Sequence, residues 1–170
     1  MNIPPPAVIR EKLVNWFGFP EQETHVQVAT SSDNHPHVRT MKLYEMTQDG
    51  SCIVLSHTKT QKWHDLQVSP YIAILFVNYD FGQITVEGVA HLKTRKNSDI
   101  RRYWECMPEP IQRIYTSSPG EEVPDSFGVI SVQPFSWEML EINKIDYNHS
   151  IRRKFFPENG SWRSQELRSV

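Results

Sequence analysis

The chain has 170 residues and a nearly balanced charge, with 18 basic and 20 acidic side chains and a formal net charge of −2. This length suits one domain with one hydrophobic core. The charge balance argues against a nucleic-acid-binding protein, because it provides no general attraction for a phosphate backbone. The two cysteines, Cys52 and Cys106, are too few for a disulfide framework, so we expect packing residues in a reducing compartment.

The first 20 residues are predicted to form a helix. Three prolines at 4–6 precede apolar residues at helical spacing, and Gly18 and Pro20 end the pattern. The segment has no basic region joined to a long apolar stretch, and no window reaches the roughly 18 apolar residues of a membrane span. We therefore expect a soluble, cytoplasmic protein with no membrane partner.

Residues 25–92 alternate between strand-like and turn-like patterns. Strands are expected at 25–30, 38–46, 52–55, 71–77 and 83–92. A turn at 31–36 makes the first two a hairpin, and a helix from about Thr60 to Val68 interrupts the series. The period-two alternation of 83–92 is the clearest strand signal in the chain.

The remaining residues begin with a helical pattern, in which Ile100, Tyr103, Trp104 and Met107 share one face and Asn97 or Ser98 is the expected N-cap. A short helical piece and a polar loop at 117–125 follow. Closing strands are expected at 127–132, 137–142, 151–156 and 161–167. Many short antiparallel strands with a few peripheral helices predict a single α+β domain that is mainly β and forms a barrel, and the family resemblance described below implies a split barrel of Greek-key type.

One region carries most of the functional signal. A basic strand segment, Arg39 to Tyr44, is followed one strand later by hydroxyls, an amide and lysines between Ser56 and Lys62, where a helix begins. Free N–H groups at the N-terminus of a helix favour an anion. Together the two segments predict a phosphate site in a β-barrel.

The order of these motifs resembles the FMN-binding split barrels of the pyridoxamine 5′-phosphate oxidase family. The pattern is Arg-x-x-x-Leu on a strand, then Ser-x-x-x-x-Gln-Lys-x-x-Asp-Leu-x-x-x-Pro, then Gln-hydrophobic-x-Val-x-Gly. It continues with Trp137-Glu138, basic residues after His149, and Trp162 before Leu167, so it covers most of the chain. The resemblance implies an FMN cofactor bound in a groove between the two subunits of a homodimer.

The resemblance also implies roles for individual residues. Arg39 and Lys62 would pair with the FMN phosphate, and Ser56 and Gln61 would add hydrogen bonds. Backbone groups would line the isoalloxazine ring along Thr40, Met41, Lys42 and Leu43.

Three further positions would contact the ring. Gln83 would meet its polar edge. From the partner subunit, Leu140 falls where the family often has an aromatic residue, and Arg152, with Arg153 as the alternative, falls near the family's ring-contacting arginine.

The chain departs from the oxidases on the substrate side. Where those enzymes hold the substrate phosphate with cations, this chain has Tyr44, Met107 and Tyr147. At about 1.5–3 kcal/mol for each lost charge-assisted hydrogen bond, phosphate-substrate binding would weaken by several powers of ten. We therefore expect a flavin-dependent oxidoreductase acting on another small substrate, with Tyr103 and His149 as substrate contacts and His149 also as a proton donor.

Alternatives from other classes stay open. A genuine pyridoxamine 5′-phosphate oxidase with a rebuilt phosphate pocket is one. A non-catalytic flavin or haem binder is another, with His149 or His57 as haem ligands. A related flavin or deazaflavin could replace FMN. No metal site is expected, because His35 and His37 lie in a predicted solvated turn with no cluster of Cys, Asp or Glu to complete a ligand set.

Overall fold

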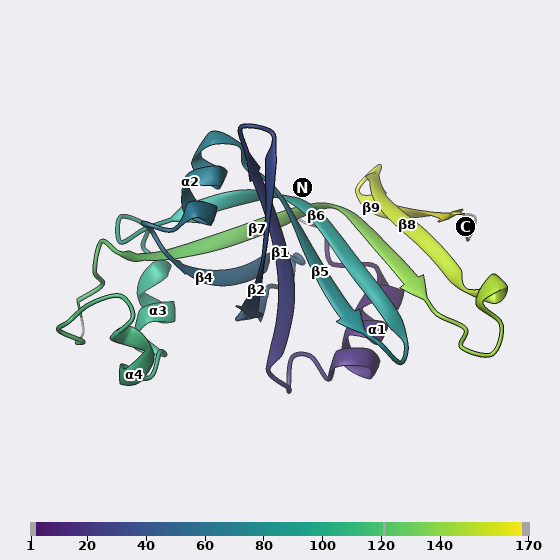
Figure 1. Cartoon of the computed structure of the whole chain (residues 1–170), viewed down its shortest axis with the longest axis horizontal. Helices are drawn as coiled ribbons and strands as arrows, with labels where there is room; N and C mark the ends of the chain where they lie inside the picture. The colour runs from purple at the N-terminus through teal and green to yellow at the C-terminus, as the bar shows by residue number, and fades with distance from the viewer. Residues whose placement is uncertain (1–2, 121, 168–170) are drawn as a thin grey trace.

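The structure, a computed structural model, describes residues 3–120 and 122–167. Within these ranges nine strands form one antiparallel sheet, with bounds β1 Thr24–Ser32, β2 His35–Leu43, β3 Glu45–Met46, β4 Cys52–His57, β5 Tyr71–Asn78, β6 Gly82–Lys93, β7 Phe127–Glu141, β8 Ile151–Glu158 and β9 Ser161–Leu167. The helices are α1 Ala7–Phe17, α2 Gln61–Val68, α3 Ile100–Glu105 and α4 Glu109–Gln112, with a short 3₁₀ helix at Tyr147–His149. The expected mainly β fold with a few peripheral helices is confirmed (Figure 1).

The sheet curls into a split barrel. Its strand order is β2-β1-β5-β6-β7-β4-β3, so β2 and β3, which follow each other in the chain, stand at opposite ends of the sheet. The two ends meet at Tyr44, whose backbone N–H donates to the carbonyl of Ile53 at 2.8 Å. β4 lies beside β7 although two strands and three helices separate them in sequence, which is the Greek-key feature. Beyond this corner β2 pairs only with β1, and its outer edge is free of strand partners.

The barrel interior is built by alternation along the strands. Val26, Val28, Ile74, Val86 and similar inward residues are fully buried, because successive side chains of a strand point to opposite faces. α1 closes one side of this core with Ile9, Leu13 and Trp16. α3 and α4 pack at the other end of the molecule, as Figure 1 shows. No helix of the described residues is long and apolar enough to span a membrane.

Three strand predictions were wrong. The strand expected at 38–46 is two strands, because β2 ends at Leu43 and β3 begins at Glu45 at the opposite end of the sheet. The structure has one strand, β7, where two were expected, because Pro134 falls opposite a register shift between Glu87 and Gly88 and a bulge tolerates its missing N–H. The first hairpin turn is only Asp33 and Asn34, both at positive φ, so β2 begins at His35. His37 therefore lies on a strand and not in a turn.

Two smaller predictions also failed. Asp99, and not Asn97 or Ser98, occupies the N-cap position of α3, and the Asn97 side chain instead accepts a hydrogen bond from the Thr94 N–H. Cys52 is a packing residue as expected, and its burial raises the pKa of its thiol to about 12. Cys106, by contrast, is exposed just beyond the end of α3.

Candidate functional site

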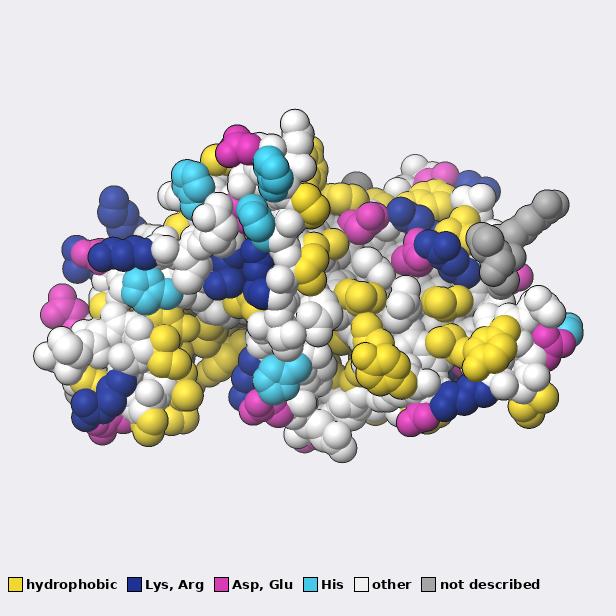
Figure 2. All heavy atoms as spheres, in the orientation of Figure 1, with side chains coloured by type: hydrophobic (Ala, Val, Ile, Leu, Met, Phe, Trp, Pro, Cys, Tyr) yellow, Lys and Arg dark blue, Asp and Glu magenta, His cyan; other side chains and the backbone are white. Residues whose placement is uncertain are grey.

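A cavity of ≈ 520 Å³ opens at the split of the barrel, between the free edge of β2, β4, α2 and the α3–α4 segment. Its basic end is formed by Arg39 of β2 and Lys62 of α2. Its other end is mainly apolar and is lined by Tyr44, Leu55, Met107, Pro108, Ile111 and Tyr115. Figure 2 shows basic side chains gathered at the head of the hollow between β2 and the α3–α4 end, beside a group of histidines.

The guanidinium of Arg39 is held from the strand next to it. Arg39 alternates inward on β2, and its Nη1 donates to the Thr30 hydroxyl at 2.7 Å and to the Val28 carbonyl at 3.2 Å, both on β1. Its Nη2 lies 3.7 Å from the Asp65 carboxylate, an ion pair without a hydrogen bond. Burial lowers the pKa of Arg39, and the charge of Asp65 partly opposes this.

Lys62 is the cation that the site leaves uncompensated. It is half-buried, and its pKa is lowered, first by burial and then by the charge of Arg39. Across residues 3–120 and 122–167, no hydrogen-bond or ion-pair partner is found for its ammonium. Two neighbouring cations, of which only Arg39 has a carboxylate nearby, form an arrangement that an anion stabilises.

Asp65, which the sequence pattern did not single out as a site residue, is the centre of a buried network. Its side chain is 0% exposed. Its Oδ2 accepts from Thr30 Oγ1 at 2.6 Å and lies 3.0 Å from His37 Nδ1. Its Oδ1 accepts from Ser32 and Gln61, each at 2.8 Å. Burial alone would raise the pKa of Asp65, but these hydrogen bonds outweigh it and bring the pKa well below its usual range.

The network decides where two predicted phosphate contacts lie. Gln61 turns its amide toward Asp65, on the helix that carries Lys62. Ser56 is buried, and its hydroxyl lies 3.2 Å from the His57 carbonyl and 3.1 Å from the Thr60 hydroxyl. Both residues therefore border the basic end of the cavity without lining it.

The predicted ring-lining segment follows the free edge of β2. Thr40, Met41 and Lys42 line the cavity, whereas Leu43 is buried in the core. The Lys42 ammonium is already paired with Glu23 at 2.5 Å. Because β2 has no strand partner on this side, its backbone groups there are available to a ligand.

Tyr103 lies behind the cavity wall. It is buried, contacts Tyr44 edge-on, and donates its hydroxyl to Glu45 at 2.9 Å, with Arg102 beside it. Burial and the Glu45 carboxylate raise the pKa of Tyr103 to about 12. The aromatic side chains that reach the cavity are Tyr44 and Tyr115, of which Tyr115 was not predicted as a site residue.

A second group of predicted residues lies elsewhere on the sheet. Gln83 of β6 stands opposite Leu140 of β7, which stands opposite Arg152 of β8, so the three form one row across adjacent strands. β1 and β5 separate β6 from β2, so this row is not part of the wall that holds Arg39. Arg152 is paired with Glu138 at 2.7 Å. We call these three residues the outer row.

His149 also lies away from the cavity. It occupies the 3₁₀ helix between β7 and β8, where its exposed ring lies 2.7 Å from the Asp146 carboxylate. The structure therefore brings together Arg39, Lys62 and the β2 edge, but leaves the outer row and His149 outside the cavity of the same chain.

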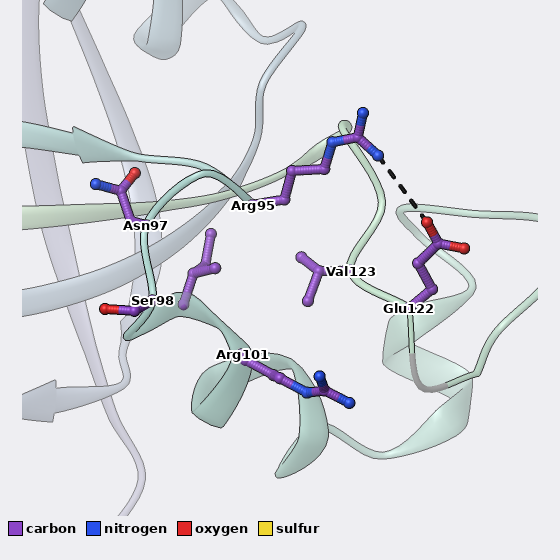
Figure 3. Close-up of a pocket in the computed structure, with 7 residues that line it drawn as sticks. Arg95, Asn97, Ser98, Arg101, Glu122 and Val123 are labelled. Atoms are coloured by element: carbon purple, nitrogen blue, oxygen red, sulfur yellow. Dashed lines mark ion pairs between the residues drawn. The ribbon is translucent and has the colours of Figure 1, made fainter.

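Another hollow, of ≈ 490 Å³, lies beside α3 (Figure 3). Its basic side chains already have acidic partners: Arg95 lies 2.5 Å from Asp125 and 4.0 Å from Glu122, and Arg101 lies 2.6 Å from Glu105. This hollow therefore has no uncompensated cation comparable to Lys62 that could bind an anion.

Several solved structures have this fold, and one of them is described as FMN-binding. A pyridoxamine 5′-phosphate oxidase-related, FMN-binding protein of Nostoc punctiforme is 16% identical with a TM-score of 0.79, covering 98% of this chain and 99% of its own. PhzG of Burkholderia lata, solved with tetrahydrophenazine-1-carboxylic acid, is 15% identical with a TM-score of 0.77, covering 96% and 94%. General Stress Protein 26 of Bacillus anthracis is 19% identical with a TM-score of 0.59, covering 77% and 92%. At these identities the likeness establishes the fold.

No curated protein matches the chain. The family model for pyridoxamine 5′-phosphate oxidase, however, matches residues 15–141, which include β1 to β7, α2 and the whole cavity wall. The chain belongs to the pyridoxamine 5′-phosphate oxidase family.

Proposed function

We propose that this protein binds FMN at the split of the barrel and carries out flavin-dependent redox chemistry on a small substrate that lacks a phosphate. The observation that supports this most directly is the half-buried, uncompensated Lys62 beside Arg39, at the basic end of a cavity whose other end is apolar. A cavity with a basic end and an apolar end suits a ligand that has a phosphate group and a flat ring system.

The residues present fit the phosphate of FMN. A phosphate ester carries about −1.5 to −2 charges at neutral pH and accepts several hydrogen bonds. An arginine fork and a lysine point charge are the usual partners of such a group. The cavity volume of ≈ 520 Å³ falls in the range of roughly 300–1,000 Å³ that small-molecule sites occupy.

The free edge of β2 fits the ring of the flavin. Thr40, Met41 and Lys42 line the cavity, and the free edge of β2 there leaves the backbone N–H and carbonyl groups of alternate residues without a strand partner. A flavin ring carries complementary polar atoms along one side. FMN would supply the hydride or electron chemistry, and the chain would supply binding, orientation and electrostatics.

We propose that a second copy of the chain completes the site. The outer row of Gln83, Leu140 and Arg152 lies on the face of the sheet opposite the core. The same face carries apolar side chains that water would otherwise contact: Tyr71 is 63% exposed, Phe135 41% and Val77 39%. A homodimer that buries this face would place the outer row of one subunit against the cavity of the other.

The substrate end of the cavity argues against a phosphorylated substrate. Tyr44 and Met107 stand where the family oxidases hold a substrate phosphate with cations, and both line the cavity. Lys42 lies nearby, but its charge is paired with Glu23. A substrate with an apolar or aromatic face therefore suits this end better than pyridoxine phosphate does.

The test is a fluorescence titration of FMN into the wild type and into the Arg39→Ala, Lys62→Ala double variant. Two charge-assisted contacts at about 1.5–3 kcal/mol each predict that the double variant binds at least 100-fold more weakly. Lys59→Ala is the matched control, because Lys59 is exposed on the turn that precedes α2 and does not line the cavity.

If the wild-type protein does not bind FMN, the proposal is wrong. If the protein binds FMN, an oxygen-consumption assay with pyridoxine phosphate distinguishes an enzyme with another substrate from a genuine pyridoxamine 5′-phosphate oxidase. Formation of pyridoxal phosphate at an ordinary enzymatic rate would favour the alternative, a genuine oxidase with a rebuilt pocket. A Soret band in place of flavin bands in the purified protein would favour the haem alternative.

A further inference from the structure

We propose that Thr30 and Asp65 are positioning residues, which hold the Arg39 guanidinium aimed at the phosphate and keep it from collapsing into a direct salt bridge. This inference rests on the proposed FMN site. It assigns a function to Thr30 and Asp65, which do not line the cavity and were not among the predicted phosphate contacts.

The Thr30 hydroxyl is a hydrogen-bond relay between Arg39 and Asp65, and each of its two hydrogen bonds has a defined direction. Its hydroxyl has one proton, which it donates to the carboxylate of Asp65 at 2.6 Å. A lone pair on the same oxygen then accepts from Arg39 Nη1 at 2.7 Å. With the Val28 carbonyl as a second acceptor at 3.2 Å, one corner of the guanidinium is fixed to β1. Its other N–H groups make no hydrogen bond to any described residue, so they are available to an anion.

Asp65 is saturated by groups other than Arg39. A carboxylate offers about four lone-pair positions. Thr30, His37, Ser32 and Gln61 together make four hydrogen bonds to it. Arg39 Nη2 therefore stays at 3.7 Å, close enough to be stabilised by the negative charge but outside hydrogen-bonding distance.

The same carboxylate joins the two elements that carry the cations. Its partners come from β1, β2 and α2, while Lys62 lies three residues before Asp65 on α2. Residues three apart on a helix share a face, so fixing Asp65 against β1 also fixes Lys62 relative to Arg39. The negative charge offsets the repulsion between the two cations when no anion is bound.

The test compares FMN with riboflavin, which has the same ring and no phosphate. In Thr30→Val, which keeps the side-chain shape, the relay is lost and a position on Asp65 opens toward Arg39. We expect FMN affinity to fall about tenfold, corresponding to one net hydrogen bond to a charged group, with riboflavin affinity unchanged. Thr30→Ser should restore the FMN preference, because it restores the hydroxyl.

The matched control is Thr24→Val, which removes a buried hydroxyl from the same strand but outside the network, where it donates to the Gln22 carbonyl at 3.2 Å. In an Arg39→Ala background, Thr30→Val should leave the ratio of FMN to riboflavin affinity unchanged, because the residue through which it acts is absent. Circular dichroism of every variant verifies that it folds.

The outcomes separate the two proposals. A wild type that binds riboflavin as tightly as FMN overturns the phosphate site itself. A wild type that prefers FMN, with a Thr30→Val variant that prefers it equally, overturns the positioning role alone. Should Thr30→Val not fold, Ser32→Ala opens a position on the same carboxylate, and an unchanged FMN preference there also overturns the inference.

Discussion

Lys62 lies so close to Arg39 that the charge of the guanidinium raises the cost of charging the lysine. Burial and the neighbouring guanidinium both lower the pKa of Lys62, which means that its charged form is less stable here than in water. Such an arrangement is stable because β1, β2 and α2 are held together through Asp65 and by their packing. A dianion that binds between the two cations would remove this penalty, which is the physical reason for expecting tight phosphate binding at this site.

This residue-scale argument predicts how binding depends on pH. The lowered pKa of Lys62 means that its charge is lost at a lower pH than the ordinary value of about 10.4. The FMN phosphate loses its second proton near pH 6, as phosphate esters do. The ratio of FMN to riboflavin affinity should therefore rise as the pH passes about 6 and fall as the pH rises through the lowered pKa of Lys62.

The variant Lys62→Arg tests the assignment, because arginine stays charged throughout this range. Its affinity ratio should hold at alkaline pH where that of the wild type falls. The ratio also removes any effect of ring ionisation, which FMN and riboflavin share. A wild-type ratio that stays flat up to about pH 11 would show that the lysine charge does not reach the phosphate.

At the scale of elements, the position of α2 is set by its packing on the start of β7. Trp63, the residue after Lys62, is buried against Gly128, which is paired with Ser56 in the β4–β7 ladder. A Cβ at Gly128 would overlap the indole ring of Trp63. The indole is rigid, so the helix itself would have to move to accommodate even a methyl group.

Gly128→Ala should therefore lower the free energy of unfolding by about 1–3 kcal/mol, the usual cost of overpacking a core. It should also weaken FMN binding, because the displaced helix carries Lys62. Denaturant unfolding and FMN titration measure the two effects. Gly120→Ala is the matched control, since an added Cβ there meets nothing within 4 Å. Equal stability of the two variants would mean that α2 adapts without cost.

At the scale of the whole molecule, the predicted site falls into two parts that one chain does not join. The Arg39 cavity lies on β2 at the split of the barrel, and the outer row lies on β6, β7 and β8. Between them the outer face of β5 carries Ala73, Leu75 and Val77, which are only partly covered within the chain. The proposed homodimer would explain both the divided site and the apolar face.

Leu75→Arg tests this at the centre of the face, where Leu75 stands opposite Gln27 on one side and Thr85 on the other. We expect analytical ultracentrifugation to show a dimer for the wild type and a monomer for the variant, because a buried unpaired charge opposes association. The affinity for FMN should also fall when the dimer is lost. Val14→Arg, on an exposed position of α1, should change neither property. A monomeric variant with wild-type FMN affinity would show that one chain is enough for the site.

The sequence by itself determined the features that depend on short-range patterns. Alternation placed most strands and set Arg39 on a strand, helical spacing and Pro70 bounded α2, and the motif order indicated the family that the comparison confirmed. The grouping of Arg39 with Lys62 was also predictable, because the strand edge and the helix start belong to one recurring motif.

Only the tertiary structure decided which distant residues meet. Asp65 joins three elements, and its helical spacing from Lys62 was a visible signal, but its partners on β1 and β2 could not be known before the packing of α2. The row that joins Gln83, Leu140 and Arg152 depends on strand register, and the bulge opposite Pro134 on β7 resets that register. Local patterns follow from the geometry of neighbouring residues, so the sequence was enough to predict them. Strand register and long-range contacts follow from how the whole core packs, so they could be determined only from the fold.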